Sequence, residues 1–241
     1  MKKLKKYAYI TLMTKEEFLP GVLILNESLR RVHSQYPLKC LITDNITEQT
    51  KKILSNANIE FIIVDKIELP SQILDYNNSI NPLQTAGWAD CLTKLHIFKF
   101  EQYDKIIFCD ADLLFLKNCD HCFKMPHMTA ALDGEYMNLW PKHPHFNSGF
   151  MVIKPSKDEF EKIMTFITNF KPEQAISYFM NPAQGVFADQ ELLNLFYGTW
   201  KLNIDLHLSK YYNVFPPHII NVNTKDVLDN AYFVHFVGQK P

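Results

Sequence analysis

Three absences narrow the function of this 241-residue sequence before any motif is considered. It has no Gly-x-Gly-x-x-Gly after its first predicted strand and no Walker loop, which counts against a dinucleotide-dependent oxidoreductase and a P-loop NTPase. Its formal net charge is −1, so no overall positive field exists to hold a nucleic acid. No segment approaches the ~18 consecutive apolar residues of a membrane-spanning helix. We therefore expect neither a nucleic-acid partner nor a membrane span.

Cysteine is also too sparse to build a disulfide framework, since there are five in the chain, an odd number. Cys119 and Cys122 form one C-x-x-C, but no second pair or histidine pattern completes a zinc site. The lysine-rich start is followed by only about seven apolar residues and no small-residue cleavage site, so it is interpreted as a strand and not as a signal peptide. These features predict reduced thiols and a cytoplasmic protein.

What the sequence does contain is an alternation of strands and helices over its first 64 residues. The predicted strands are Tyr7–Met13, Leu38–Ile42 and Glu60–Val64, and the predicted helices are Phe18–Val32 and Asn45–Asn56, the second with Thr47 as its N-cap. Strand-helix-strand units of this kind indicate an α/β fold with a mostly parallel, doubly wound sheet. No internal repeat or linker divides the chain, so we predict a single domain spanning residues 1–241.

The remaining segments are predicted from the same patterns. Residues 65–87 are polar and are predicted to be a loop or lid. The predicted helices are Trp88–Tyr103, Lys157–Phe170 and Asp189–Tyr197, and the predicted strands are Met128–Leu132, Phe150–Ile153 and Tyr232–Phe236. A further strand is predicted in the stretch Lys105–Leu116, with two aspartates at its exit.

The stretch Lys105–Leu116, KIIFCDADLLFL, carries the most informative motif, two aspartates at the exit of a predicted strand. Asp110 and Asp112 interrupt two apolar runs that suit a strand buried on both faces. Unpaired anions are costly to bury, so these carboxylates need water, a cation or a metal. Two aspartates around a turn can direct oxygens toward one Mg²⁺ or Mn²⁺ ion. A strand-end turn with solvated acids is the alternative for this short motif.

Three further segments carry polar groups beside strands or helix starts. Asn147-Ser148-Gly149 forms a small polar lead into a strand, where the backbone can approach a ligand closely. Asp189-Gln190 opens a helix, and Asp189 could simply cap it. His235 follows a strand and precedes Gly238 and Lys240, and a structural role for this histidine is the alternative to metal binding.

Six blocks in this order resemble glycosyltransferase family eight, the group that includes glycogenin and galactinol synthase. The blocks are YITL at Tyr9–Leu12, LTKLHIF at Leu92–Phe98, DADLLFL at Asp110–Leu116, FNSGFMVIKPS at Phe146–Ser156, ADQELLN at Ala188–Asn194 and VHFVGQKP at Val234–Pro241. The resemblance covers almost the whole chain, and it implies a GT-A fold. Residues 1–115 would form the nucleotide-binding half and residues 116–241 the half for donor sugar and acceptor.

The resemblance also implies a metal centre and a UDP-sugar donor. Asp110, Asp112 and His235 would bind Mn²⁺, with Mg²⁺ as the alternative ion, and oxygen ligands with one imidazole suit Mn²⁺. Lys240 would lie at the β-phosphate, Gly238 would let the backbone pass close, and Lys94 would lie near the phosphate and the sugar. A solvated helix lysine is the alternative for Lys94. The other implied donor-binding positions are Thr11, Leu12, Thr14 and Phe18 for uridine, Ala111 between the two aspartates, Gly149 in the small polar strand entry, and Asn147, Ser148, Asp189 and Gln190 for the sugar.

The reaction implied is transfer of a hexose, glucose or a related sugar, with retention at the anomeric carbon. The implied catalytic residues are Asp189, Gln190 and Lys94. A covalent route would use Asp189 as nucleophile, whereas a front-side route needs no protein nucleophile and depends on electrostatic stabilisation. We favour the front-side route.

Departures from glycogenin leave the sugar and the acceptor open. Val186 stands where glycogenin has an acid, which places glucose in doubt, and the acceptor is a carbohydrate, a polyol or a protein. The segments expected to contact it are Asp75–Gly87, Asp133–Pro144 and Lys171–Gln184. Tyr211 or Tyr212 would carry the sugar in a self-glycosylating primer protein, although this segment also resembles the lining of an acceptor pocket. A UDP-sugar-binding module without catalysis is a third possibility, and the family suggests a homodimer.

Overall fold

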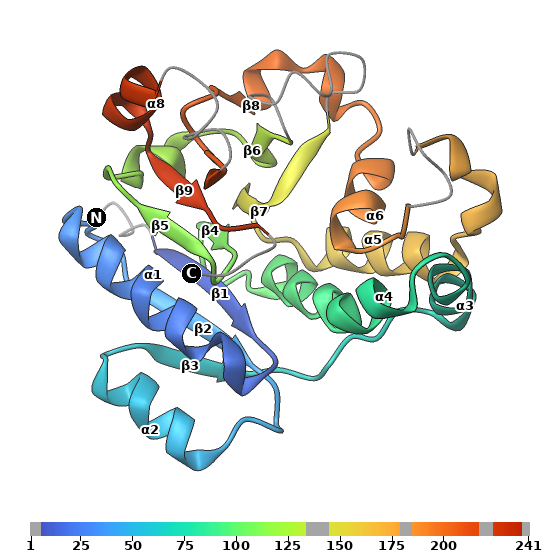
Figure 1. Cartoon of the computed structure of the whole chain (residues 1–241), viewed down its shortest axis with the longest axis horizontal. Helices are drawn as coiled ribbons and strands as arrows, with labels where there is room; N and C mark the ends of the chain where they lie inside the picture. Colours follow the sequence, from blue (N-terminus) through green and yellow to red (C-terminus); the bar gives the residue numbers. More distant parts are fainter. Residues whose placement is uncertain (1–5, 134–144, 179–184, 217–223, 238–241) are drawn as a thin grey trace.

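The computed structural model describes residues 6–133, 145–178, 185–216 and 224–237 (Figure 1). Its main sheet has seven strands in the order β3-β2-β1-β4-β7-β6-β8, and β5 and β9 form a second, two-stranded sheet. The strands are β1 Tyr7–Met13, β2 Leu38–Ile42, β3 Glu60–Ile63, β4 Lys105–Cys109, β5 Leu113–Phe115, β6 Thr129–Leu132, β7 Phe146–Ile153, β8 His207–Leu208 and β9 Phe233–His235. None of the described helices is long and apolar enough to cross a membrane.

Helices cover both faces of the main sheet (Figure 1). The α-helices are α1 Leu19–Arg31, α2 Glu48–Asn56, α3 Ser71–Ile80, α4 Pro82–Trp88, α5 Lys157–Asn169, α6 Asp189–Phe196 and α8 Thr224–Asn230. Short 3₁₀ segments are Glu16–Phe18, Cys91–Lys99, Asp120–Lys124, Pro172–Gln174, Ile176–Tyr178, Trp200–Leu202 and Ile204–Leu206. One face packs against α5, α6 and Cys91–Lys99, and the other packs against α1, β5 and β9.

The first part of the sheet is parallel, as predicted. β1 pairs in parallel with β2 and with β4, and β2 pairs in parallel with β3. Thr47 caps α2 by accepting a hydrogen bond from the Thr50 N–H at 3.3 Å, which confirms the predicted N-cap. The predicted α/β class and mostly parallel sheet are therefore confirmed.

The second part of the sheet is antiparallel around β7. β7 pairs antiparallel with both β4 and β6, and all eight of its residues are buried. The predicted strand Phe150–Ile153 is longer than expected, because the polar residues 147–149 already belong to it. β6 begins one residue later than predicted, since Met128 adopts a left-handed φ of 62° that cannot continue a strand.

The prediction of a loop over residues 65–87 is wrong, because α3 and α4 occupy most of it. Each helix buries few side chains, Ile73 and Asn77 in α3 and Thr85 in α4. α4, which buries no apolar side chain, leaves a weak helical pattern in the sequence. α3 is as amphipathic as α1 and was missed despite its pattern. The predicted helix Trp88–Tyr103 is instead the 3₁₀ segment Cys91–Lys99, in which residues 92–98 are all buried.

A strand ends at the two aspartates, as predicted within the stretch Lys105–Leu116. β4 ends at Cys109, residues 110–112 form a turn, and β5 then pairs antiparallel with β9 in the second sheet. Both strands are apolar because both are buried, so the sequence does not reveal the change of sheet. The turn places Asp110 and Asp112 between the two sheets.

Candidate active site

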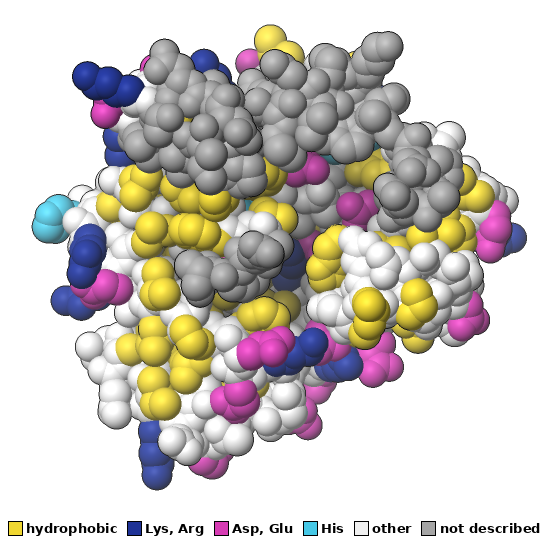
Figure 2. Space-filling model, in the orientation of Figure 1, with side chains coloured by type: hydrophobic (Ala, Val, Ile, Leu, Met, Phe, Trp, Pro, Cys, Tyr) yellow, Lys and Arg dark blue, Asp and Glu magenta, His cyan; other side chains and the backbone are white. Residues whose placement is uncertain are grey.

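A cavity of about 830 Å³ opens at the carboxyl ends of β1 and β4. Ligands of open α/β sheets bind in this place. Figure 2 shows the molecule hollowed near the centre of the view, with charged side chains inside the hollow. The lining residues come from α1, the turn between β4 and β5, α4, β7, α6 and the end of β9. Segments far apart in the sequence thus meet around one space.

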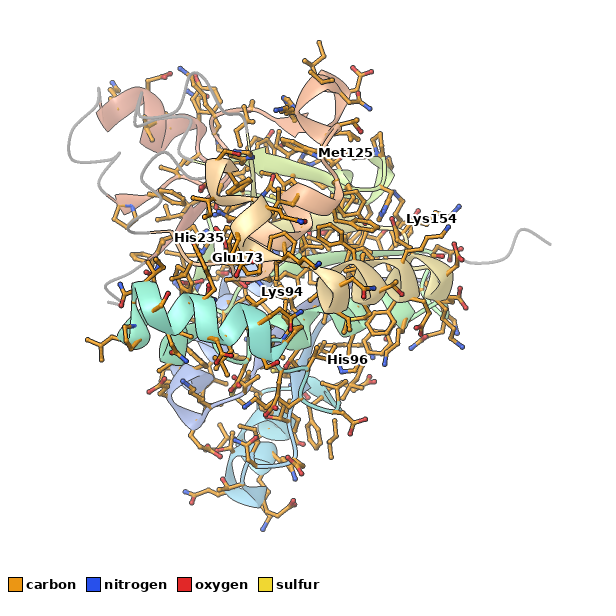
Figure 3. All side chains as sticks on the ribbon, turned by 90° about the vertical axis from the view of Figure 1, so that its right-hand side faces the viewer. Lys94, His96, Met125, Lys154, Glu173 and His235 are labelled. Carbon is orange, nitrogen blue, oxygen red and sulfur yellow. The ribbon has the colours of Figure 1, made fainter. Side chains whose placement is uncertain are left out.

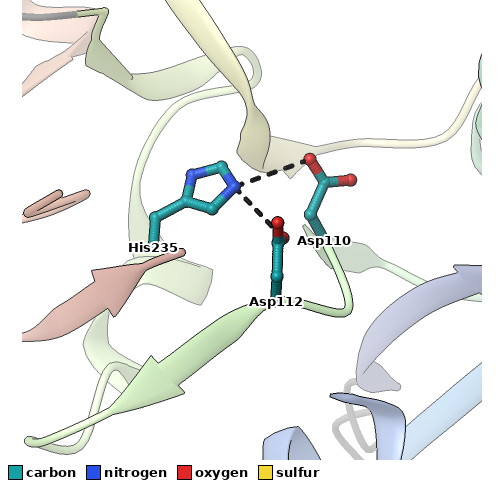
Figure 4. A group of neighbouring side chains, drawn as sticks. All are labelled: Asp110, Asp112 and His235. Atoms are coloured by element: carbon teal, nitrogen blue, oxygen red, sulfur yellow. Dashed lines mark ion pairs between the residues drawn. The ribbon is translucent and has the colours of Figure 1, made fainter. Parts of the chain in front are cut away.

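At one end of this cavity, Asp110, Asp112 and His235 converge (Figure 4). His235 Nε2 lies 3.2 Å from Asp112 Oδ1 and 4.0 Å from Asp110 Oδ2. The pairing of Leu113 with His235 across the β5–β9 sheet brings the histidine beside the aspartates. One potential ligand atom from each residue lies within 4.8 Å of the others, so the three side chains can bind one ion.

Gly149 makes this cluster possible by leaving space beside it. A Cβ at this position would lie 2.5 Å from His235 Cε1 and 2.9 Å from Asp110 Oδ2. Both separations are shorter than any ordinary contact, so a side chain here would displace the histidine ring or the carboxylate. Gly149, predicted to lie where the backbone approaches the donor, lies against the candidate metal ligands.

Lys94 connects the two ends of the cavity from the buried 3₁₀ segment (Figure 3). Its Nζ lies 3.2 Å from Asp110 Oδ1 and 2.7 Å from Asp189 Oδ2. Burial alone would lower the pKa of Lys94, but Asp110 and Asp189 together raise it above its ordinary value. Lys94 is therefore a buried cation between two carboxylates, and the alternative of a solvated helix lysine is wrong.

Burial raises the pKa of Asp110, and Asp112 raises it further, while Lys94 lowers it. Two neighbouring carboxylates thus share a site where negative charge is unfavourable. A bound cation would relieve this cost.

At the other end, a hydrogen-bonded network joins β7 to α6. Ser148 Oγ donates to Asp189 Oδ2 at 2.6 Å, and the Ser148 N–H donates to Gln190 Oε1 at 3.1 Å. Ala188 is the N-cap of α6, and its N–H donates to the side chain of Glu191. Asp189 therefore does not cap the helix; it binds Lys94 and Ser148.

Asp133 belongs to this network and was missed by the sequence reasoning. Its Oδ1 accepts a hydrogen bond from Asn147 Nδ2 at 3.2 Å, and its Oδ2 accepts one from Gln190 Nε2 at 3.1 Å. Burial raises the pKa of Asp133, and these two amides oppose the rise. The missed signal was an acid directly after a short apolar strand, the same signal that identified Asp110.

Glu191 also lines this end of the cavity. Burial raises its pKa to about 7, and the nearby charges of Asp189 and Asp133 act in the same direction. The sequence reasoning did not select it, because an acid in the third position of a helix is common in a capping box.

Most of the predicted nucleotide positions line the cavity, but Thr11 does not. Leu12, Thr14, Phe18 and Ala111 contribute to the lining. The Thr11 side chain is fully buried in the core, and its Oγ1 has no hydrogen-bond partner in the described part of the chain. Gly238 and Lys240 lie outside the described residues.

The two tyrosines considered for self-glycosylation do not line the cavity. Tyr212 is buried, its ring stacks on Tyr232 at 4.2 Å, and its hydroxyl lies 2.7 Å from His121 Nε2. Tyr211 donates a hydrogen bond to Asp226 Oδ2 at 3.1 Å. Phe215, from the same segment, does line the cavity.

Comparisons with known proteins agree with this geometry. Residues 9–241 match the sequence model of glycosyl transferase family 8. Glycogenin-1 of Oryctolagus cuniculus is 31% identical over 239 residues, covering 96% of this chain and 64% of that protein. The putative UDP-glucuronate:xylan alpha-glucuronosyltransferase 4 of Arabidopsis thaliana is 29% identical over 238 residues, covering 98% of this chain and 36% of that protein. The chain thus spans less than two thirds of the length of these relatives.

Solved structures show the same fold. The galactosyltransferase LgtC, in complex with donor and acceptor sugar analogs, superimposes with a TM-score of 0.57 at 15% identity, covering 95% of this chain and 87% of that one. At this identity the likeness concerns the fold, and it confirms the predicted GT-A fold. The match of residues 9–241 to the family model shows that this chain belongs to glycosyl transferase family 8.

Proposed function

We propose that this protein transfers a hexose from a UDP-sugar to an acceptor hydroxyl, with retention at the anomeric carbon and with Mn²⁺ as cofactor. One observation carries the proposal: a candidate metal centre and a network of hydrogen-bonded polar groups lie in one cavity, joined by Lys94. Transfer from a nucleotide-sugar needs positive charge at the phosphates and oriented polar groups at the sugar.

The donor atoms at the metal end fit Mn²⁺. Two carboxylates and one imidazole are ligands that this ion accepts, whereas Mg²⁺ favours oxygen ligands alone. When bound, the ion would supply positive charge against the departing UDP.

The protein's own residues would hold and orient the sugar. Asp133, Asn147 and Gln190 are already fixed by their mutual hydrogen bonds, so hydroxyl groups would meet preoriented donors and acceptors. Lys94 would balance the negative charge of Asp110 and Asp189 in the cavity. A site whose polar groups each bind one hydroxyl discriminates strongly between sugars.

The contacts of Asp189 favour the front-side route. Its Oδ2 accepts hydrogen bonds from both Lys94 and Ser148. The ion pair with Lys94 and the hydrogen bond from Ser148 draw negative charge from this carboxylate, which makes it a poorer nucleophile. We propose that Asp189 anchors Lys94 and Ser148, and that the leaving phosphate takes the proton of the acceptor. Mass spectrometry that detects a hexose attached to Asp189 during turnover would contradict this assignment.

The charges around the sugar end favour a neutral hexose over a uronic acid. Asp133, Asp189 and Glu191 line this end, and Lys94 is the one cation among the described lining residues. A sugar carboxylate would meet three acids and a lysine that is already engaged. We therefore propose UDP-glucose or a related neutral UDP-hexose as the donor, although one relative is named for UDP-glucuronate.

Thermal unfolding tests the proposal with UDP and Mn²⁺, added singly and together. We expect a rise in Tm only with both, since a ligand at 100 times its Kd adds about 2.7 kcal/mol to the free energy of unfolding. The Asp112→Asn variant should fold and lose this rise. Asp205→Asn, at an exposed site outside the cavity, is the matched control and should keep it.

The metal assignment fails if Asp112→Asn responds like the wild type. The assignment of a nucleotide-sugar donor fails if no nucleotide raises Tm under any condition. If Tm rises with UDP and Mn²⁺, a comparison of hydrolysis of, or transfer from, UDP-glucose, UDP-galactose and UDP-glucuronate would identify the sugar.

A further inference from the structure

The segment preceding Phe215 flanks β9 on the side away from β5. Val214 and Val234 form a parallel bridge. The Val214 N–H donates to the Phe233 carbonyl at 3.2 Å, and the His235 N–H donates to the Val214 carbonyl at 2.9 Å. The backbone of His235 is therefore held on both sides, by β5 and by this segment.

Asn213 extends this support to the side chain of His235. It is 4% exposed, and its Oδ1 lies 2.7 Å from His235 Nδ1. Its φ of 60° is left-handed, a conformation that asparagine adopts more easily than most residues. The turn aims the amide at the imidazole from the side opposite the aspartates.

This contact fixes which ring nitrogen carries a proton. A carbonyl oxygen can only accept a hydrogen bond, so Nδ1 must donate. The lone pair of a neutral ring then lies on Nε2, the nitrogen that faces Asp110 and Asp112. If Nδ1 had no acceptor, the proton could move to Nε2 and donate to Asp112, which would block a metal ion.

We propose that Asn213 is a positioning residue that holds a proton on His235 Nδ1 and so presents Nε2 to a divalent cation between Asp110 and Asp112. The proposal rests on the metal site of the proposed function. Hydrogen-bond partners of metal-binding histidines typically contribute 10–100-fold to metal affinity. Phe215 packs edge-on against the ring at 5.7 Å and supplies no acceptor.

Two variants separate the hydrogen bond from the backbone conformation. Asn213→Gly adopts the left-handed φ readily but removes the acceptor. Asn213→Asp keeps an acceptor in the same place and also tolerates this φ. Asn58→Gly is the matched control, because Asn58 has a φ of 56° and lies at the exposed end of α2.

The first readout is the affinity for Mn²⁺ in the presence of UDP, measured by electron paramagnetic resonance. We expect Asn213→Gly to bind Mn²⁺ about 10–100-fold more weakly, Asn213→Asp to stay within a few-fold of wild type, and Asn58→Gly to be unchanged. Wild-type affinity in Asn213→Gly would overturn the proposal. So would an equal loss in Asn213→Asp and Asn213→Gly.

The second readout needs no metal. Nitrogen-15 NMR of histidine-labelled protein should show a slowly exchanging proton on His235 Nδ1 in the wild type and in Asn213→Asp, and its loss in Asn213→Gly. Assignment uses the signal that disappears in His235→Gln. If the wild type keeps this proton but binds no Mn²⁺, the positioning is supported and the proposed metal is wrong. If the wild type lacks the proton, the positioning itself is wrong.

Discussion

The two ends of the cavity differ in how far their charged and polar groups are paired within the protein. At the end that we propose for the sugar, Asp133 accepts a hydrogen bond from Gln190, and Asp189 binds Ser148 and Lys94. At the metal end, Asp110 and Asp112 lie together beside His235, and the pKa of Asp110 is raised. The sugar end is therefore preorganised by its own hydrogen bonds, whereas the metal end gathers negative charge that a cation would balance. This comparison predicts that changes at the sugar end cost stability and changes at the metal end cost binding.

The largest effect on stability should come from Lys94→Met, which removes the cation that joins the two ends. Asp110 and Asp189 would both lose their buried partner. Breaking a buried ion pair typically costs 3–5 kcal/mol of the free energy of unfolding. Urea denaturation measures this loss, and Lys99→Met in the same 3₁₀ segment is the control.

Adding Asp189→Asn to Lys94→Met should recover part of the loss, because one uncompensated carboxylate disappears. If Lys94→Met is as stable as the wild type, the lysine does not compensate the two carboxylates.

Gly149→Ala should lower both the stability of the protein and its binding of UDP and Mn²⁺. The added Cβ would meet His235 and Asp110 at less than 3 Å, and overpacking of this kind typically costs about 1–3 kcal/mol. The displaced ligands should also abolish the rise in Tm with UDP and Mn²⁺. Gly87→Ala, on the rim of the same cavity, meets nothing within 4 Å and should keep that rise. An unchanged response in Gly149→Ala would show that the cluster does not need this space.

The smallest effect is a pH dependence at the sugar end. Burial raises the pKa of Glu191 from an ordinary 4.5 to about 7, so between these values the folded protein holds a proton that the unfolded chain has released. This contribution to stability is complete below the unfolded pKa and is lost as the pH rises toward 7. The side chain is partly exposed to water, which weakens the effect below that of the full pKa shift, so we expect a loss of roughly 1–2 kcal/mol in the free energy of unfolding.

Glu191→Gln should remove this pH dependence, since an amide does not titrate. Urea denaturation at pH 5 and pH 8 measures it. An equal pH dependence in the wild type and in Glu191→Gln would contradict the assignment to this carboxyl group.

The parallel half of the fold was predictable because its elements are periodic and separate. β1 and β2 occur at the predicted residues, and Thr47 caps α2. The failures have a common physical cause. Periodicity reports burial and not connectivity, so the sequence did not show that the run Leu113–Phe115 pairs with β9 in a second sheet. Where a helix buries few side chains, as α4 does, the sequence pattern is too weak to predict it.

The candidate site was predictable where short motifs carry their chemistry. Asp110, Asp112, His235 and Gln190 were identified and lie around one cavity. Asp133 and Asn213 were not, because each acts through a partner distant in the sequence. The acid that binds Gln190 carries one local signal, its place directly after a short apolar strand, whereas nothing local distinguishes the asparagine that binds His235 from a turn residue.

The pairing of β5 with β9 also has a consequence for how the protein is made. About half of the chain lies between Asp112 and His235, so both aspartates leave the ribosome long before the histidine does. Domains tend to fold as they emerge from the amino terminus, and closing so long a loop carries an entropic cost. The nascent chain can build the parallel sheet early, but it cannot bring the three candidate ligands together until β9 is synthesised. Competence to bind a cation through all three side chains thus depends on β9 leaving the ribosome.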